Sequence, residues 1–184
     1  MTISQIYTTA PSSREGVEQA AFDLLEQLAI PYTRVEHESA DTMEDCRAIS
    51  ETLGVSICKN LVLCNRQQTQ FYLLCMPADK PFKTKDLSAQ INSSRLSFAS
   101  GEKMVELLGV TPGSASILSL MNDKEHAVQL LLDRELCDQP YFGCHPCKNT
   151  GSLKLATFDV LNTFLPHVQH TAIIVDLPNY EVNA

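Results

Sequence analysis

Three short segments of the sequence carry residue types that can bind or activate a substrate. The first is Lys59-Asn60, which opens the apolar run LVLC. A lysine at the start of a buried strand is commonly a surface residue whose aliphatic stem packs on the protein. The same position also puts a charged donor at the rim of a sheet, where it can hold a phosphate or polarise a carbonyl group. The spacing by itself supports both interpretations.

The second segment is the small-residue run GVTPGSAS at 109–116. One interpretation is an ordinary helix stop followed by a turn, which Gly109 and Pro112-Gly113 favour. The other is a loop whose backbone N–H groups approach a ligand, because glycine and serine keep bulky side chains out of the way. Both interpretations stay open.

The third segment, GCHPCKNT, contains Cys144, His145 and Cys147. A structural zinc site needs four ligands, commonly supplied as two pairs. No second Cys-x-x-Cys pair occurs, and His167 and His170 are too close together to be the usual histidine pair, so no metal is predicted. His145 is then either a turn residue with its hydrogen bonds satisfied or a pocket histidine that binds a substrate.

Length and composition indicate the kind of protein that must hold these segments. The chain has 184 residues, of which 44% are hydrophobic and 20% charged, so we expect one globular domain over residues 1–184, with residues 1–11 as a flexible N-terminal tail. No apolar run reaches the roughly 18 residues that a membrane helix needs, and the polar N-terminus lacks the apolar core of a secretory signal. Seven cysteines, an odd number, then favour reduced thiols and a cytoplasmic location.

Charge is unevenly distributed along the chain. The net charge of −8 argues against broad nonspecific binding to nucleic acid. Residues 59–103 nevertheless carry seven basic and three acidic side chains, a net charge of +4. This basic block is either a solvated face or a local phosphate-binding patch that would contact one end of a nucleic acid. Its basic residues are Lys59, Arg66, Lys80, Lys83, Lys85, Arg95 and Lys103.

The elements that must position these residues are predicted from hydrophobic periodicity and capping residues. Ser12 and Ser13 are the expected caps of the first helix, Asp41 or Thr42 opens the second, and Pro166 ends the last. The predicted helices cover residues 17–28, 42–53, 84–91, 100–108 and 157–165. The predicted strands cover residues 32–36, 59–65, 70–76, 95–98, 127–132, 151–155 and 172–176, of which the second and third form a hairpin and the last is buried. Helices and strands mix without strict alternation, which favours an α+β fold with a mixed, largely antiparallel sheet.

Taken in chain order, several short motifs form a set that resembles the YbaK/prolyl-tRNA synthetase-associated editing domain family. The motifs are KNLVL at 59–63, YLL at 72–74 with PADK at 77–80, RLSFAS at 95–100, LGVTPGS at 108–114, ND at 122–123, HP at 145–146 and NT at 149–150. Each motif is short, and the specificity lies in the ordered set. The resemblance covers about residues 15–177 and is greatest to the free-standing deacylases that hydrolyse alanyl-tRNA(Pro).

The resemblance implies an α+β fold in which helices surround a barrel-like sheet. It also implies hydrolysis of the ester that joins a wrong amino acid to tRNA, with no metal and no cofactor, because that ester is already activated. The catalytic residues it implies are Lys59, Gly113 and Ser114. The substrate-binding residues it implies are Asn60, Ala115, Ser116, His145 and Asn149.

A mechanistic hypothesis follows from this assignment. The backbone N–H groups of the loop at 113–116 stabilise the oxyanion, and Lys59 holds the tRNA 3′ end near the carbonyl group. A water attacks, with the terminal ribose hydroxyl as a candidate assistant. The expected partners are the acceptor end of mischarged tRNA(Pro) and prolyl-tRNA synthetase, with no membrane. The expected tRNA-binding residues are Arg66, Lys80, Lys83 and Lys85.

The sequence departs from the family pattern at two positions. Ile117 stands where the family loop usually ends in proline, and Cys147 replaces an apolar residue after His-Pro. Three alternatives stay open. They are the same reaction on cysteinyl- or seryl-tRNA, a noncatalytic module that binds tRNA or a synthetase, and a small zinc protein built on Cys144, His145 and Cys147.

Overall fold

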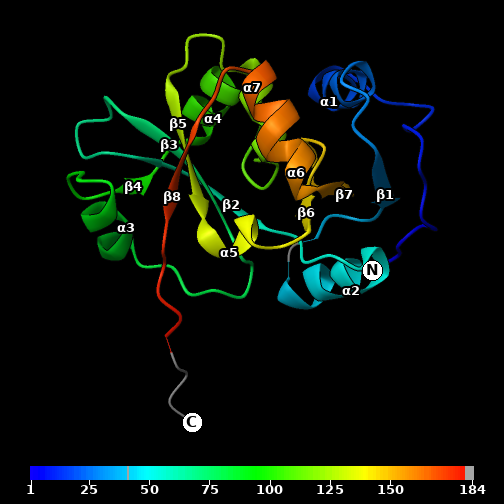
Figure 1. The fold of residues 1–184 in the computed structure, drawn as a ribbon, viewed down its shortest axis with the longest axis horizontal. Helices are drawn as coiled ribbons and strands as arrows, with labels where there is room; N and C mark the ends of the chain where they lie inside the picture. The colour runs from blue at the N-terminus through cyan, green and yellow to red at the C-terminus, as the bar shows by residue number, and fades with distance from the viewer. Residues whose placement is uncertain (41, 181–184) are drawn as a thin grey trace.

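Two β-sheets organise the fold in the computed structural model, which describes residues 1–40 and 42–180 (Figure 1). The larger sheet has five strands in the order β4-β2-β3-β5-β8. These strands are β2 (Lys59–Cys64), β3 (Phe71–Met76), β4 (Ser97–Phe98), β5 (Val128–Asp133) and β8 (Ala172–Val175). β2 pairs antiparallel with β3 and β4, whereas β5 runs parallel to β3 and β8. The predicted hairpin and the mixed α+β fold are thus confirmed.

The smaller sheet is antiparallel and contains β1 (Tyr32–Glu36), β7 (Gly151–Ala156) and β6 (Tyr141–Cys144). Within the described residues, an isolated bridge between Ile57 and Gly143 links it to the chain just before β2. The expected barrel-like sheet is therefore not closed into a barrel. Gly143 permits the close approach, because a Cβ atom there would clash with the Ser56 carbonyl and lie 3.0 Å from Ile57 Cα.

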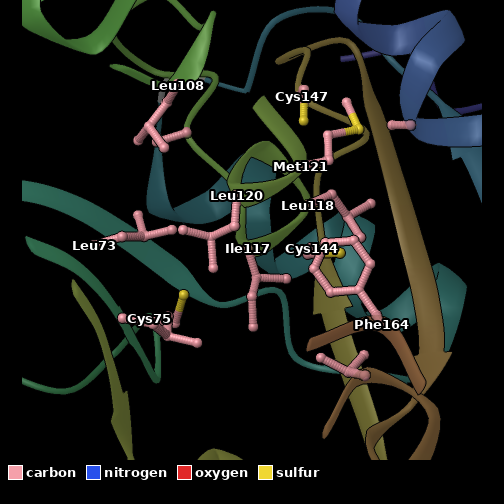
Figure 2. Packing of buried hydrophobic residues seen from close by; sticks show 14 of the residues in the cluster. Leu73, Cys75, Leu108, Ile117, Leu118, Leu120, Met121, Cys144, Cys147 and Phe164 are labelled. Carbon is pink, nitrogen blue, oxygen red and sulfur yellow. The ribbon is translucent and has the colours of Figure 1, made fainter. Parts of the chain in front are cut away.

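The 3₁₀-helix η1 (Ile117–Asn122) packs into the core to which both sheets contribute. Ile117, Leu118 and Leu120 are at most 1% exposed. Figure 2 shows Leu120 pointing toward Leu73 of β3, while Leu118 lies beside Phe164. Burying each such side chain stabilises the fold by about 1.5–3 kcal/mol. This packing fixes the loop that precedes η1 relative to both sheets.

Helices cover the sheets (Figure 1). They are α1 (Gly16–Gln27), α2 (Met43–Leu53), α3 (Thr84–Gln90), α4 (Gly101–Leu108), α5 (Arg134–Cys137), α6 (Thr157–Asp159), the π-helical η2 (Val160–Phe164) and α7 (Leu165–His167). Thr42 caps α2 as predicted, because its hydroxyl accepts a hydrogen bond from the Asp45 N–H, and Gly54 ends that helix at a φ of 64°. Asp41, the alternative start of α2, lies outside the described residues.

Two predicted helix ends are wrong. α1 begins at Gly16 with Glu15 as its N-cap, so Ser12 and Ser13 do not cap it. Gly16 has a φ of 57°, a left-handed conformation that turns the chain into the helix at that point. The last helix continues to His167, with Pro166 in the first turn of α7 directly after η2. The missing N–H of proline costs little at the start of a helical turn.

Two predicted environments also differ from the structure. β8 lies at the edge of the larger sheet, so Ile173 and Ile174 are 42% and 39% exposed and the strand is only partly buried. Residues 1–11 are not a free tail, because β1 is an edge strand whose open side pairs with them. The pairs are Ile3 with His37 and Tyr7 with Arg34.

Candidate active site

One pocket brings together residues from all three segments that the sequence singles out. Lys59 and Asn60 come from β2, Gly113 and Ala115 from the loop before η1, and His145 from the turn after β6. The pocket has a volume of about 260 Å³. Pockets for drug-sized ligands measure roughly 300–1,000 Å³. The pocket therefore suits a small chemical group.

Lys59 is the first residue of β2 and is half-buried at the pocket. The β2–β3 register pairs it with Met76, which brings the turn after β3 next to its side chain. Its Nζ donates a hydrogen bond of 2.8 Å to the main-chain oxygen of Lys80 in that turn. Burial lowers the pKa of Lys59 below its ordinary value, and Asp79 partly opposes this. The ammonium group has two further N–H groups to offer to a ligand.

The loop at 113–116 presents backbone to the pocket. Gly113 has a φ of 87°, which favours glycine, and it lines the pocket together with Ala115. Within the described residues, the N–H groups of Gly113 and Ala115 donate no hydrogen bond to the backbone. These two N–H groups are the loop's candidates for stabilising an oxyanion.

The two serines of the loop do not have the expected roles. The Ser114 N–H donates to the Thr111 carbonyl at 3.0 Å, so it belongs to a turn, and Ser114 does not line the pocket. Ser116 is fully buried and donates a 2.6 Å hydrogen bond to the main-chain oxygen of His145. Its hydroxyl also accepts a hydrogen bond from the Leu118 N–H at the start of η1. Ser116 therefore joins the loop to the His145 segment, and it is not among the residues that line the pocket.

His145 contributes a neutral imidazole to the pocket. Its Nδ1 lies 3.0 Å from the main-chain oxygen of Gly151, which only accepts, so Nδ1 carries the proton. Burial lowers the pKa of His145 below its ordinary value, the Gly151 hydrogen bond opposes this, and His37 lowers the pKa further. At neutral pH, Nε2 therefore has a free lone pair that can accept a hydrogen bond.

The two expected asparagines differ in position. Asn60 lines the pocket, where its Nδ2 donates to the Cys58 main-chain oxygen at 3.3 Å. Asn149 donates to the Ser39 hydroxyl at 2.9 Å and does not line the pocket. Its Nδ2 would be 3.7 Å from a Cβ atom placed on Gly113, so Asn149 lies beside the glycine loop.

Sequence reasoning missed part of the pocket wall. The additional lining residues are Ala40, Thr42, Cys46, Ile57, Cys58 and Ala78. Burial raises the pKa of the Cys46 thiol, and Asp45 adds to the effect, so the thiol stays protonated at neutral pH and supplies no thiolate nucleophile. The capping pattern of α2 is visible in the sequence. Nothing in that pattern indicates that the start of the helix lines the same pocket as Lys59.

One of the four expected tRNA-binding residues is placed differently. Lys80 is only 4% exposed, and its Nζ forms ion pairs of 3.0 Å with Asp133 and 2.9 Å with Glu135. A buried ammonium that is already paired is not available to a phosphate, so the prediction for Lys80 is wrong. The other three residues, Arg66, Lys83 and Lys85, are exposed.

The segment with Cys144, His145 and Cys147 does not form a zinc site in the part of the chain that the structure describes. Cys144 and Cys147 are buried, and burial raises the pKa of both thiols, that of Cys147 to about 12. Among the described residues, no three His, Cys, Asp or Glu side chains converge as a metal-binding group. The two cysteines instead pack in the hydrophobic core (Figure 2).

Comparison with solved structures identifies the class of fold. A proposed trans-editing enzyme for prolyl-tRNA synthetase superposes with a TM-score of 0.69 at 16% identity, covering 91% of this chain and 100% of that one. The fold is therefore that of an editing domain. No helix within the described residues is long and apolar enough to cross a membrane.

Comparison of sequences then identifies the family. Residues 37–163 match the aminoacyl-tRNA editing domain. The chain is 31% identical over 143 residues to the prolyl-tRNA editing protein ProX of Acetoanaerobium sticklandii, which covers 78% of this chain and 87% of that protein. It is also 31% identical over 155 residues to the prolyl-tRNA synthetase associated domain-containing protein 1 of Danio rerio, covering 83% of each chain. The chain belongs to the aminoacyl-tRNA editing domain family and is an aminoacyl-tRNA hydrolase. The family expected from the ordered motifs is confirmed.

Proposed function

We propose that this protein acts in trans to remove wrongly attached amino acids from tRNA(Pro), and that alanyl-tRNA(Pro) is its main substrate. The observation that carries the proposal is the convergence of Lys59, Gly113 and His145 on one pocket of about 260 Å³. The relatives support the choice of tRNA, since one is named a prolyl-tRNA editing protein. The name of the Danio rerio relative supports an association with prolyl-tRNA synthetase.

The lining of the pocket supports alanine as the amino acid. A synthetase site shaped for proline cannot strongly reject a smaller side chain, because each missing methylene is worth only about 1–3 kcal/mol of discrimination. A second site corrects this error if it admits the smaller group and excludes the larger one. Ala40, Cys46 and Ile57 give the pocket apolar walls that would accept a methyl group. We expect this site to act less well on the larger proline ring.

The residues of the pocket divide the chemistry among them. The N–H groups of Gly113 and Ala115 stabilise the oxyanion that forms when water attacks the ester carbonyl. Lys59 holds the phosphate of the terminal nucleotide, and so positions the ester. The Nε2 lone pair of His145 accepts a hydrogen bond from the α-ammonium group of the aminoacyl ester. The terminal ribose hydroxyl assists the water, because none of the described residues that line the pocket carries a carboxylate.

The exposed part of the basic block is the proposed contact with the tRNA acceptor end. Arg66, Lys83 and Lys85 are exposed on an otherwise acidic protein. Contacts of this kind fix orientation on the phosphate backbone, while the pocket reads the amino acid. Lys80 has no part in this contact.

A deacylation assay with four substrates tests the proposal. Alanyl-, cysteinyl-, seryl- and prolyl-tRNA(Pro) are incubated separately with the protein, and release of the labelled amino acid is followed over time. We expect fast release of alanine and no release of proline above the spontaneous rate. Preferential release of cysteine or serine would keep the reaction and change the substrate. Tight tRNA binding without release of any amino acid would show a noncatalytic binding module.

A further inference from the structure

The turn after β3 has features that a surface turn does not need. The Lys80 N–H donates to the Pro77 carbonyl at 3.2 Å, which closes the turn. Pro81 follows directly, and a residue before proline is restricted to extended conformations. The main-chain oxygen of Lys80 is therefore held in one direction. That oxygen accepts the 2.8 Å hydrogen bond from the Lys59 ammonium group.

The side chain of Lys80 fixes this turn to the centre of the larger sheet. Its Nζ lies 3.0 Å from both carboxylate oxygens of Asp133, at the end of β5, and 2.9 Å from Glu135. The Lys80 and Asp133 side chains are 3% and 0% exposed. Burial by itself would lower the pKa of Lys80, but the hydrogen bonds to Glu135 and Asp133 outweigh it, so the pKa is raised and the lysine stays charged.

We propose that Lys80 is a positioning residue for the reaction: its ion pairs with Asp133 and Glu135 together fix the main-chain oxygen that holds the Lys59 ammonium group at the pocket. A lysine side chain has a flexible four-carbon stem, so by itself its ammonium group is not held in one position. A hydrogen bond to a rigid carbonyl removes much of that freedom before the substrate arrives. The inference rests on the proposed function of Lys59 in holding the tRNA end.

A merely structural ion pair makes a different prediction. In that case the loss of the pair would lower the free energy of unfolding and leave the turnover of the folded protein unchanged. A positioning role predicts a fall in kcat in the folded protein, because misplacement of a reacting group by about 1 Å can cost about 100-fold in rate. Binding of the tRNA through other contacts would remain, so KM should change little.

The main variant is Lys80→Met combined with Asp133→Asn. Both charges are removed together, because a single substitution would leave an unpaired buried charge and unfold the protein. Asparagine keeps the oxygen that accepts the Glu135 N–H at the start of α5, a contact of 3.0 Å. The matched control is Arg134→Ala, which removes an exposed ion pair with Asp176 from the same helix and is expected to leave kcat unchanged.

Two measurements decide the outcome. Turnover of misacylated tRNA(Pro), measured below the melting temperature of the variant, should fall about 10-fold or more in kcat while KM stays within about threefold. In ¹⁵N NMR spectra of lysine ammonium groups, the Lys59 signal should be protected from exchange in the natural protein and lost in the double variant. A folded double variant with unchanged kcat, or with the Lys59 signal retained, would overturn the proposal.

A milder variant covers the case in which the double variant does not fold. Glu135→Gln weakens the partly exposed partner of Lys80 and leaves the buried pair with Asp133 intact. We expect a fall of about twofold to threefold in kcat, and faster exchange of the Lys59 ammonium signal. No change in either quantity would refute the positioning role. If the natural protein deacylates none of the four substrates, the proposed function fails, and the NMR comparison by itself still decides whether Lys80 positions Lys59.

Discussion

The side-chain hydroxyl of Ser116 donates a 2.6 Å hydrogen bond to the main-chain oxygen of His145, 29 residues further along the chain. This contact joins the loop that contributes the Gly113 and Ala115 N–H groups to the loop that contributes the His145 imidazole. The Ser116 hydroxyl bonds to the main chain of His145 and not to its imidazole ring, so the residue types alone do not predict the contact. The relationship shows that the pocket is held together by a buried hydrogen bond between main chain and side chain.

Removal of this contact should harm both stability and activity. In Ser116→Ala the His145 carbonyl and the Leu118 N–H each lose their partner in the interior. A buried polar group without a partner costs about 1–3 kcal/mol, so we expect the free energy of unfolding to fall by that amount. Urea denaturation measures this, and deacylation of alanyl-tRNA(Pro) should slow as well. Ser88→Ala, which removes a hydroxyl that bonds to Thr84 on α3, is the control with little expected effect.

Lys59→Met should abolish deacylation and preserve the fold. Methionine keeps most of the aliphatic stem and loses the half-buried ammonium group, so packing at the start of β2 is retained. Loss of one charged donor at a reaction centre commonly costs about 100-fold to 1,000-fold in rate. Deacylation kinetics and circular dichroism check the two halves of this prediction. Near-normal turnover by Lys59→Met would contradict the assignment. The control is Lys124→Met, which changes an exposed lysine outside the pocket and should leave turnover unchanged.

Activity should depend on the protonation of His145. Burial holds its pKa below the ordinary value of 6.5, so the ring is neutral at pH 7 and its Nε2 accepts a hydrogen bond. As the pH falls through that lowered pKa, the imidazolium loses the lone pair and repels the α-ammonium group of the substrate. We expect KM to rise with acid, with a midpoint below 6.5 after subtraction of spontaneous hydrolysis.

The pH experiment has a built-in check on folding. Because the pKa of His145 is lower in the folded chain than in the unfolded chain, the unfolded state takes up the proton first, and stability also falls in acid below about 6.5. Kinetics are therefore restricted to the pH range in which the circular dichroism spectrum is constant. A His145→Gln variant whose KM shows the same acid dependence would assign that dependence to another group.

Binding of tRNA should weaken with salt. If Arg66, Lys83 and Lys85 contact phosphates, each contact releases counterions, and the logarithm of the binding constant falls linearly with that of the salt concentration. Replacement of all three by alanine should make this dependence on salt weaker, reducing the magnitude of the slope by about 2 to 3. Titration of labelled tRNA at several salt concentrations measures the slope. Lys154→Ala, which removes a lysine stacked 4.2 Å from the Tyr141 ring on the other sheet, should leave it unchanged.

Gly143→Ala should destabilise the junction between the two sheets. The new Cβ atom would clash with the Ser56 carbonyl and press on Ile57, both of which are backbone of the segment that leads into Lys59. Overpacking of this kind typically costs about 1–3 kcal/mol, which thermal denaturation would show as a lower melting temperature. Gly151→Ala, where the nearest atom belongs to the Pro146 side chain at 3.3 Å, should cost less. Equal stability of the two variants would refute this account of the junction.

The sequence by itself determined the local features of this protein. Two apolar runs joined by a polar link placed the β2–β3 hairpin, a capping pattern placed the start of α2 at Thr42, and the ordered short motifs indicated the family. These features depend on residues that are neighbours in the chain, so they can be read from types and spacing. The candidate residues Lys59 and His145 were found for the same reason.

Only the tertiary structure decided which candidates meet and which are used elsewhere. Lys80 and Lys83 are lysines of the same basic block, three residues apart, yet one is buried against Asp133 and the other is exposed. Ser114 and Ser116 differ from Ala115 in that the turn and the His145 carbonyl occupy their polar groups. The junction between the two sheets and the pocket wall from α2 are likewise set by packing between distant segments. Burial, charge pairing and hydrogen-bond partners across the fold are physical properties of the assembled chain, and no local spacing encodes them.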